Sequence, residues 1–270
     1  MRNSITVNLG NLVLSLSDAM DLASPILTKH QQRTAYAVWQ MGKNADILPG
    51  SLEKCFTAAL LHDIGALSLE EKISIRNYEV DDTETHCIQG RDLLKKTPWF
   101  KEAGEIIRFH HREWQEWSDS IENPVVFESQ LIFLADFIER QIRRDIHILN
   151  QTDDILQKLK GHSGTSFHPQ VVELFLASSD REEFWLDLVS PRLYSILLNE
   201  GPFRKTEIDL SQISLISELF RNIIDFRSPF TSRHSSGVSA CASILSGIFG
   251  LSGLEIELMG VAGNIHDLGI

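Results

Sequence analysis

Seven histidine and aspartate residues in the N-terminal half of the chain have the types and the order that a metal centre needs. They are His30, His62, Asp63, His86, His110, His111 and Asp136. Imidazole and carboxylate groups without a thiolate suit iron, manganese, zinc or nickel better than ions that prefer soft ligands. Two such ions about 3.5 to 4 Å apart can activate a water molecule for hydrolysis. The set therefore predicts a divalent-metal site with hydrolytic chemistry, in which the seven residues are ligands.

Each of these residues, taken alone, also has a structural explanation. A histidine in a helix is commonly solvated or hydrogen-bonded, and near a helix C-terminus its protonated form is favoured by the helix dipole. The pair His62-Asp63 would then be a polar cap after an apolar helix, and His110-His111 a chance pair on an amphipathic surface. Metal binding is favoured because one part of the set occurs twice.

The chain contains two copies of a pattern in which one His precedes a His-Asp pair. His30 precedes His62-Asp63 by 32 residues (62 − 30), and His234 precedes His266-Asp267 by the same interval (266 − 234). The surrounding residues agree as well, with Leu-His-Asp-Ile-Gly in the first copy and Ile-His-Asp-Leu-Gly in the second. A repeat at this long spacing indicates two related domains in tandem.

The second copy supplies His234, His266 and Asp267, which we expect to form an incomplete site. The counterparts of the remaining ligands would lie beyond Ile270, the last residue of the sequence. We therefore expect this part of the chain to form a few helices that pack on the first domain or on a partner chain.

Composition places the chain among ordinary soluble proteins. Its 270 residues are 43% hydrophobic with a mean hydropathy of −0.08, which supplies enough apolar material for a core. A formal net charge of −12 argues against nucleic-acid binding, which relies on a basic face. No apolar run approaches the roughly 18 to 20 residues of a membrane span, and the N-terminus lacks the pattern of a signal peptide. The cysteines Cys55, Cys87 and Cys241 form no Cys-x-x-Cys pair, which indicates reduced thiols in a cytoplasmic protein.

The elements that must position the seven candidate ligands are expected to be helices. Apolar residues recur at helical spacing, and a strand pattern is confined to residues 5–16. The polar stretch 113–123 is expected to be a loop. The helices expected around the site cover residues 31–44, 52–64, 85–96, 101–109 and 125–148. The prediction is an all-α protein in which these helices form a bundle around the ligands.

Linker-forming residues late in the chain indicate where the two copies separate. Gly201-Pro202 and the polar residues after it are typical of a linker. We predict a metal-binding domain over 1–200, a linker over 201–209, and the N-terminal part of a second domain of the same kind over 210–270.

The order His, His-Asp, His, His-His, Asp over about residues 24–145 resembles the HD superfamily of metal-dependent phosphohydrolases. More narrowly, it resembles the HD-GYP branch, the cyclic-di-GMP phosphodiesterases. The resemblance implies an all-helical bundle with two, sometimes three, divalent metal ions, commonly iron or manganese, and it makes Asp63 the carboxylate that bridges them. It also implies a cyclic dinucleotide or another phosphorylated nucleotide as the substrate.

Three features of the sequence depart from the family pattern. Ala66 stands where the family generally has a Lys that contacts a substrate phosphate, and the second copy has Ile270 there. The stretch after His110-His111 lacks the Gly-Tyr-Pro of the family. Ile26 stands where some members have a Glu that supports a third metal. The first domain thus resembles a variant that keeps the metal ligands and has lost groups that contact the substrate.

Other residues near the site are candidates for binding the substrate. A phosphate needs positive groups, and the candidates are Arg112, Arg140, Arg143 and Arg144. The alternative for these arginines is a solvated helix face. Trp114 and Trp117 are candidates for stacking a base, and ordinary packing in a loop is the alternative.

Two hypotheses of different kinds follow. In the first, the protein is an enzyme that hydrolyses cyclic dinucleotides in bacterial signalling, with a variant first domain and an active second domain in the full-length protein. In the second, the first domain is a metal-binding sensory or dimerising module, in a homodimer for example, that regulates a C-terminal HD-GYP domain and turns over nothing. The metal ligands favour the first hypothesis, and Ala66 with the missing Gly-Tyr-Pro favours the second.

Overall fold

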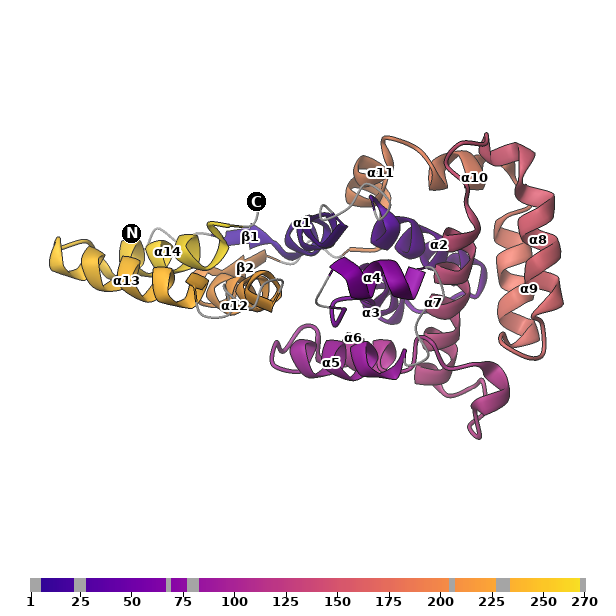
Figure 1. Ribbon diagram of the computed structural model, residues 1–270, viewed down its shortest axis with the longest axis horizontal. Helices are drawn as coiled ribbons and strands as arrows, with labels where there is room; N and C mark the ends of the chain where they lie inside the picture. Colours follow the sequence, from indigo (N-terminus) through magenta and orange to yellow (C-terminus); the bar gives the residue numbers. More distant parts are fainter. Residues whose placement is uncertain are drawn as a thin grey trace.

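The protein consists of a larger and a smaller group of helices, which a short β-ribbon joins (Figure 1). The computed structural model describes residues 6–21, 28–66, 69–76, 83–203, 207–226 and 234–267. Figure 1 shows the smaller group, α12 to α14, projecting from one side of the larger one. The prediction of an all-α protein is confirmed.

The larger group starts with α1 (Leu9–Asp21) and ends with α11 (Leu193–Glu200). The helices between them are α2 (His30–Asn44), α3 (Pro49–Leu60), α4 (Leu69–Arg76), α5 (Glu84–Leu94), α6 (Lys101–Ile107), α7 (Pro124–Gln141), α8 (Thr152–Gly161), α9 (Pro169–Ser178) and α10 (Glu182–Leu188). Two single 3₁₀ turns, η1 (Trp114–Glu116) and η2 (Ile148–Asn150), lie in its loops. The smaller group contains α12 (Leu210–Phe226), α13 (His234–Ile248) and α14 (Gly253–Ile265).

One two-stranded ribbon connects the starts of the two groups. Strand β1 (Thr6–Asn8) pairs antiparallel with β2 (Glu207–Asp209), and Val7 faces Ile208 at its centre. Helix α1 follows β1 directly, and α12 follows β2 directly. The last residue of each strand caps the helix after it, because Asn8 Oδ1 accepts a hydrogen bond from Asn11 N at 3.1 Å and Asp209 Oδ1 accepts one from Gln212 N at 3.1 Å.

The expected strand over residues 5–16 is wrong for most of its length. Only Thr6–Asn8 is a strand, and the residues from Leu9 onward are helical. Val13, Leu14 and Leu16 are buried on α1, which contacts α2, α3 and α11. Tertiary packing of this apolar face outweighs the local strand preference of the sequence.

Local signals explain where two of the site-bearing helices begin and end. Helix α3 begins with Pro49. Proline lacks an N–H group, but the N–H groups of the first helical turn have no partner within the helix, so no hydrogen bond is lost there. In α7 the Asn123 side chain accepts a hydrogen bond from Val125 N at 3.0 Å. Helix α7 ends at Gln141 rather than at 148, because the Gln151 side chain bonds to the backbone of Arg143 and so stabilises a turn there.

The core of the larger group surrounds α2 and α3, which pack against each other and against α7. Val38 and Met41 of α2 and Phe56 and Leu60 of α3 are fully buried. These two helices are therefore fixed supports for the residues at their ends. In the described part of the chain, no helix has the length and apolar character needed to cross a membrane.

Part of what the sequence predicted lies outside the described residues. Ile26 and Ile270 lie there, as do residues 204–206 of the predicted linker. The last residues of that predicted linker, Glu207–Asp209, form β2.

Candidate metal centre

His30 is the first residue of α2, where the preceding residue, Lys29, has a left-handed backbone (φ 63°). The His30 side chain is 4% exposed. Its Nε2 lies 3.2 Å from Asp63 Oδ2 and 3.4 Å from Asp136 Oδ1. The start of α2 therefore aims one ring nitrogen of His30 at two carboxylates from other parts of the chain.

The pair His62-Asp63 lies in the turn that ends α3. His62 Nδ1 donates to the Ala59 carbonyl oxygen at 2.9 Å, which leaves Nε2 directed toward the carboxylates. The turn packs closely on α5 because position 65 is glycine: a Cβ there would overlap the His86 carbonyl oxygen and the Gly90 amide nitrogen. This close approach brings α5, and with it His86, to the Asp63 carboxylate.

The remaining histidines come from α5 and from the turn after α6. His86 Nε2 and His110 Nε2 each lie 3.7 Å from Asp63 Oδ1, and 3.4 Å from each other. His110 Nδ1 donates to the Ile107 carbonyl oxygen at 2.6 Å, which orients the ring. The His111 ring is 4.1 Å from that of His110, measured between centroids. Two imidazoles thus lie beside one oxygen of Asp63, and the ring of His111 packs on one of them.

Asp136 approaches from the middle of α7. Its Oδ1 lies 3.7 Å from His62 Nε2 and accepts a hydrogen bond from Arg140 Nε at 2.9 Å. Arg140, one turn further along α7, also forms an ion pair with Oδ2 of the same carboxylate. This buried cation offsets the cost of removing the Asp136 carboxylate from water.

The structure brings all seven candidate ligands together around Asp63. Two sets of donor atoms can each hold an ion, and the atoms within each set lie within 4.8 Å of one another. One set is His30, His62 and Asp63, and the other is Asp63, His86, His110 and His111. Metal–ligand bonds of about 2.0 to 2.2 Å place neighbouring ligands about 3.0 to 3.6 Å apart, close to the spacings observed. Asp63 belongs to both sets, through Oδ2 in the first and Oδ1 in the second.

Among the seven candidate ligands, three buried polar atoms have no hydrogen-bond partner in the described part of the chain. They are His62 Nε2, Asp63 Oδ1 and His111 Nε2. A buried polar atom without a partner costs free energy, and buried polar atoms in native proteins are nearly always satisfied. All three belong to the candidate ligands and point toward the same centre, so the donor set fits a bound metal.

Two residues outside the seven candidate ligands support His30. Glu139 is buried on α7, and its Oε2 accepts from His30 Nδ1 at 2.7 Å. Its other oxygen, Oε1, accepts from Arg33 at 3.0 Å. A carboxylate behind a histidine fixes the orientation of the ring and makes the opposite nitrogen a better metal ligand. The spacing of both residues could have identified them. Arg33 lies three residues after His30 and Glu139 lies three after Asp136, so each shares a helix face with a candidate ligand.

The protonation of the buried groups reflects their mutual charges. Burial opposes the charged form of His30, but Glu139 and Asp63 outweigh it and raise the pKa of His30 to about 10. Burial opposes a charged His110 as well, and Cys87 and Asp63 raise the pKa of His110 to about 10. Against the effect of burial, His62, His110 and His30 hold the pKa of Asp63 well below its usual range. In the metal-free protein, protons on two imidazoles supply positive charge that metal ions would replace.

The candidate substrate-binding residues lie in different surroundings. Arg112 is exposed beside Trp117, with its guanidinium carbon 4.9 Å from the ring centroid. Arg140 is buried against Asp136, and Arg144 donates to the Thr28 carbonyl oxygen at 3.0 Å. Arg143 is exposed. The ring of Trp114 packs on His168 at 4.4 Å between centroids.

The second copy forms a smaller group of three residues. His234 Nε2 lies 3.2 Å from His266 Nε2 and 3.3 Å from Asp267 Oδ2. The side chains of His234 and His266 are 50% and 31% exposed. These three atoms can also approach one ion, although at the surface.

Comparison with known proteins gives a family match over the part of the chain that holds the centre. The HD domain family model matches residues 28–141. The chain is 24% identical to 3′3′-cGAMP-specific phosphodiesterase 1 of Vibrio cholerae serotype O1. The match covers 97% of this chain and 63% of that relative. It is 19% identical to phosphodiesterase 3 of the same organism, covering 98% of this chain and 68% of the relative.

A solved structure has the same fold. The crystal structure of a cyclic GMP-AMP-specific phosphodiesterase of V. cholerae superposes with a TM-score of 0.75. The sequences are 18% identical, and the match covers 98% of this chain and 71% of that one. The fold therefore extends over both groups of helices.

Proposed function

We propose that this chain, in which residues 28–141 form an HD domain, is a metal-dependent phosphohydrolase that acts on cyclic dinucleotides. The supporting observation is Asp63, whose two oxygens face separate sets of imidazoles. The relatives named above, of which the first is longer than this chain, carry the word phosphodiesterase in their names. They support the reaction class.

Each side chain of the centre has a part in this proposal. His30, His62 and Asp136 would hold one ion, His86, His110 and His111 the other, and Asp63 would bridge them. Divalent ions so held, with iron or manganese preferred and zinc or nickel as alternatives, would polarise a phosphodiester and lower the pKa of an attacking water. Glu139 and Arg140 keep His30 and Asp136 in place, and the burial of the centre strengthens its electrostatic interactions.

The substrate is proposed at the level of cyclic dinucleotides, with 3′3′-cGAMP as the first candidate. The HD-GYP resemblance favoured cyclic-di-GMP, whereas the names of the relatives specify 3′3′-cGAMP. Incubation of the iron- or manganese-loaded protein with both, and with a linear dinucleotide, followed by chromatography of the products, separates these candidates. Hydrolysis of none of them would contradict the proposal.

The decisive variant is Asp63→Ala, because both proposed ions share this carboxylate. We expect it to lose bound metal and turnover together, as measured by elemental analysis and product formation. The matched control is Asp267→Ala, which removes the corresponding residue of the second copy and should leave both values at the wild-type level. Retention of both ions and full activity in Asp63→Ala would overturn the role given to this residue.

One observation favours a second candidate function, a metal-binding module that regulates a neighbouring domain. Ala66 is buried, with 2% exposed, and offers no charge to a substrate phosphate. A lost charged contact is worth about 1.5 to 3 kcal/mol, or roughly ten- to a hundredfold in rate. We propose residues 210–270 as part of the second domain that such a module would regulate. Stoichiometric metal without turnover in the wild-type chain is the result that this alternative requires.

A further inference from the structure

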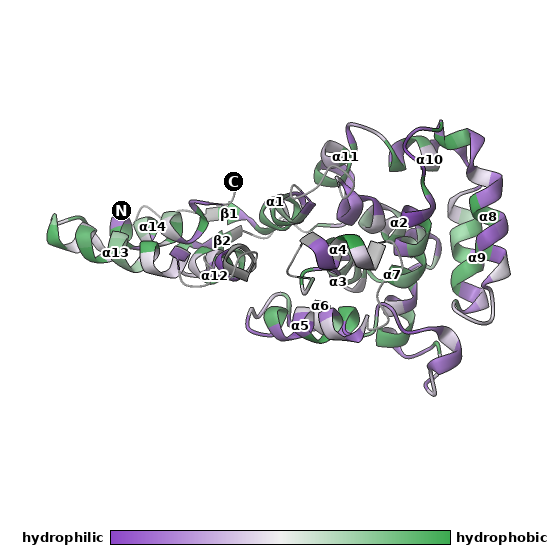
Figure 2. Cartoon of the chain, viewed as in Figure 1, coloured by the Kyte–Doolittle hydropathy of each residue, from purple (hydrophilic) through white to green (hydrophobic). Residues whose placement is uncertain are grey.

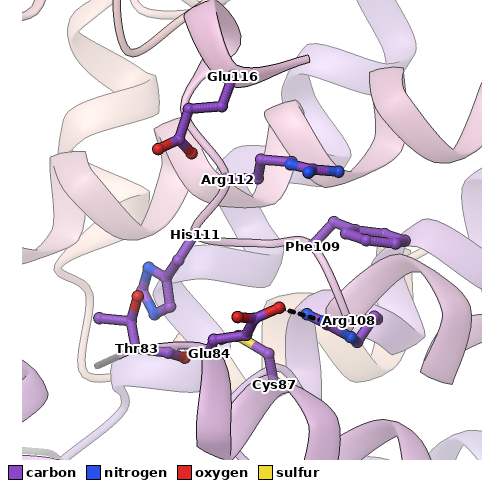
Figure 3. A pocket seen from close by; sticks show the side chains of 8 residues that line it. All are labelled: Thr83, Glu84, Cys87, Arg108, Phe109, His111, Arg112 and Glu116. Carbon is purple, nitrogen blue, oxygen red and sulfur yellow. Dashed lines mark hydrogen bonds and ion pairs between the residues drawn. The ribbon is translucent and has the colours of Figure 1, made fainter. Parts of the chain in front are cut away.

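A hollow of about 480 Å³ opens beside the candidate metal centre (Figure 3). Its walls come from the start of α5, the end of α6 and the segment that follows α6. The residues that matter here are Glu84, Cys87, Arg108, His111 and Arg112. The hollow adjoins the metal centre but contains charged groups that the centre does not use.

His111 connects the hollow with the metal centre. Its side chain lines the hollow, and its ring lies 5.0 Å from that of His86 between centroids. Cys87 lies at the same boundary, with Sγ 3.4 Å from His110 Nδ1. A molecule in the hollow would therefore contact the centre through one of its ligands.

Two arginines supply positive charge to the hollow. The guanidinium carbons of Arg108 and Arg112 lie 5.1 and 5.5 Å from the centroid of the Phe109 ring. The Trp117 ring packs on Phe109 and also contacts Arg112. These aromatic rings restrict both guanidinium groups to the same region. A planar guanidinium is well suited to bind a phosphate group through two hydrogen bonds.

Glu84, the first residue of α5, already forms an ion pair with Arg108 (Figure 3). The Glu84 side chain is 65% exposed, while that of Arg108 is 16% exposed. The carboxylate can therefore swing into solvent while the guanidinium stays in place. Exposed ion pairs are weak, so a phosphodiester can displace this one.

We propose that Arg108 binds a phosphodiester of the substrate and that Glu84 is an intramolecular competitor for the same guanidinium. This inference rests on the proposed function, since it takes a cyclic dinucleotide as the ligand. Such a ligand has two phosphodiesters, so one can bind Arg108 while the other reaches the centre. Arg112, on the other side of Phe109, adds a second positive charge.

The test measures binding without hydrolysis, with 3′3′-cGAMP as the probe and with chelated, metal-free protein, by calorimetry. We expect Arg108→Gln to weaken binding by about ten- to a hundredfold, the usual effect of losing a charge-assisted hydrogen bond. Glu84→Gln should tighten binding by about two- to fivefold, the usual strength of an exposed ion pair. Because the two effects have opposite signs, a folding defect cannot produce both.

The matched control is another exposed pair, in which Arg181 donates to Glu183 at 2.8 Å. Arg181→Gln and Glu183→Gln should bind the probe as the wild type does. Wild-type affinity in Arg108→Gln, weaker binding in Glu84→Gln, or no binding by the wild type would each overturn the inference. Failure of the proposed function is distinguishable, because it is seen as absent hydrolysis by the metal-loaded protein, whereas this assay contains no metal.

Discussion

The two copies of the motif have the same local geometry and very different surroundings. His30 Nε2 lies 3.2 Å from Asp63 Oδ2, and His234 Nε2 lies 3.3 Å from Asp267 Oδ2. The two histidine rings of each copy have centroids 5.1 Å apart. The His30 side chain is 4% exposed, however, against 50% for His234. The spacing of the motif on its two helices thus determines where three donor atoms lie, and it does not determine whether they are buried.

The helices packed around each copy account for the difference. Helix α2 of the first copy contacts α7 and α9, and α5 and α6 bring three further histidines. Helix α13 of the second copy has the same length as α2 and contacts α12 and α14. Apolar side chains on α13 and directly after it remain at the surface, with Leu245 52%, Ile248 73% and Phe249 79% exposed. Figure 2 shows this hydrophobic character along α13.

The largest effect that would test this comparison is on stability. Met41 and Leu245 hold corresponding positions (245 − 41 equals 234 − 30), and Met41 is fully buried. We expect Met41→Ala to lower the free energy of unfolding by about 2 to 5 kcal/mol, because it leaves a cavity, and Leu245→Ala to change it by less than about 0.5 kcal/mol.

Urea unfolding followed by far-ultraviolet circular dichroism measures this difference, because both groups of helices contribute to the signal. An equal loss of stability in the two variants would show that the surroundings of α2 and α13 are alike after all.

An intermediate effect is expected on metal affinity when the support behind His30 is weakened. Glu139→Gln keeps the size of the side chain and removes the charge that faces His30 Nδ1 and Arg33. Loss of such a partner typically reduces metal affinity by about ten- to a hundredfold. Competition with a chromophoric chelator gives the affinity.

The control for that variant is Glu128→Gln on the same helix. Glu128 is also buried, but it pairs with Lys54 at 3.3 Å, away from the seven ligands. Equal metal affinities in the two variants would remove Glu139 from the support of the centre.

The last effect concerns pH. In the metal-free protein the pKa values of His30 and His110 are about 10, so both imidazoles are protonated at pH 7. A metal ion must displace these protons, and affinity should rise from pH 7 toward 10 by roughly tenfold per pH unit for each proton displaced. Calorimetry in buffers with different ionisation enthalpies counts the protons released. Release of none at pH 7 would contradict the protonation described for the first copy.

The candidate ligands could be predicted because their chemistry is visible in the residue types and because the motif recurs. The supporting residues were harder to predict. Glu139 and Arg33 support the centre through hydrogen bonds across the contact between α2 and α7. Such contacts between distant segments are hard to predict from a sequence. The end of α7 was missed for a similar reason, since it depends on the distant side chain of Gln151. Residues that act through their own chemistry are easier to predict than residues that act through a neighbour.

The β-ribbon has a consequence for association that follows from its symmetry. Because α1 and α12 begin immediately after β1 and β2, Val7 and Ile208 are equivalent residues, and they face each other in the ribbon. A local two-fold axis therefore passes between them, as at the interface of a symmetric dimer. The same hydrogen bonds would form if β1 of one chain paired with β2 of another, so the ribbon meets the geometric condition for domain swapping. The high effective concentration of two strands on one chain favours the closed form.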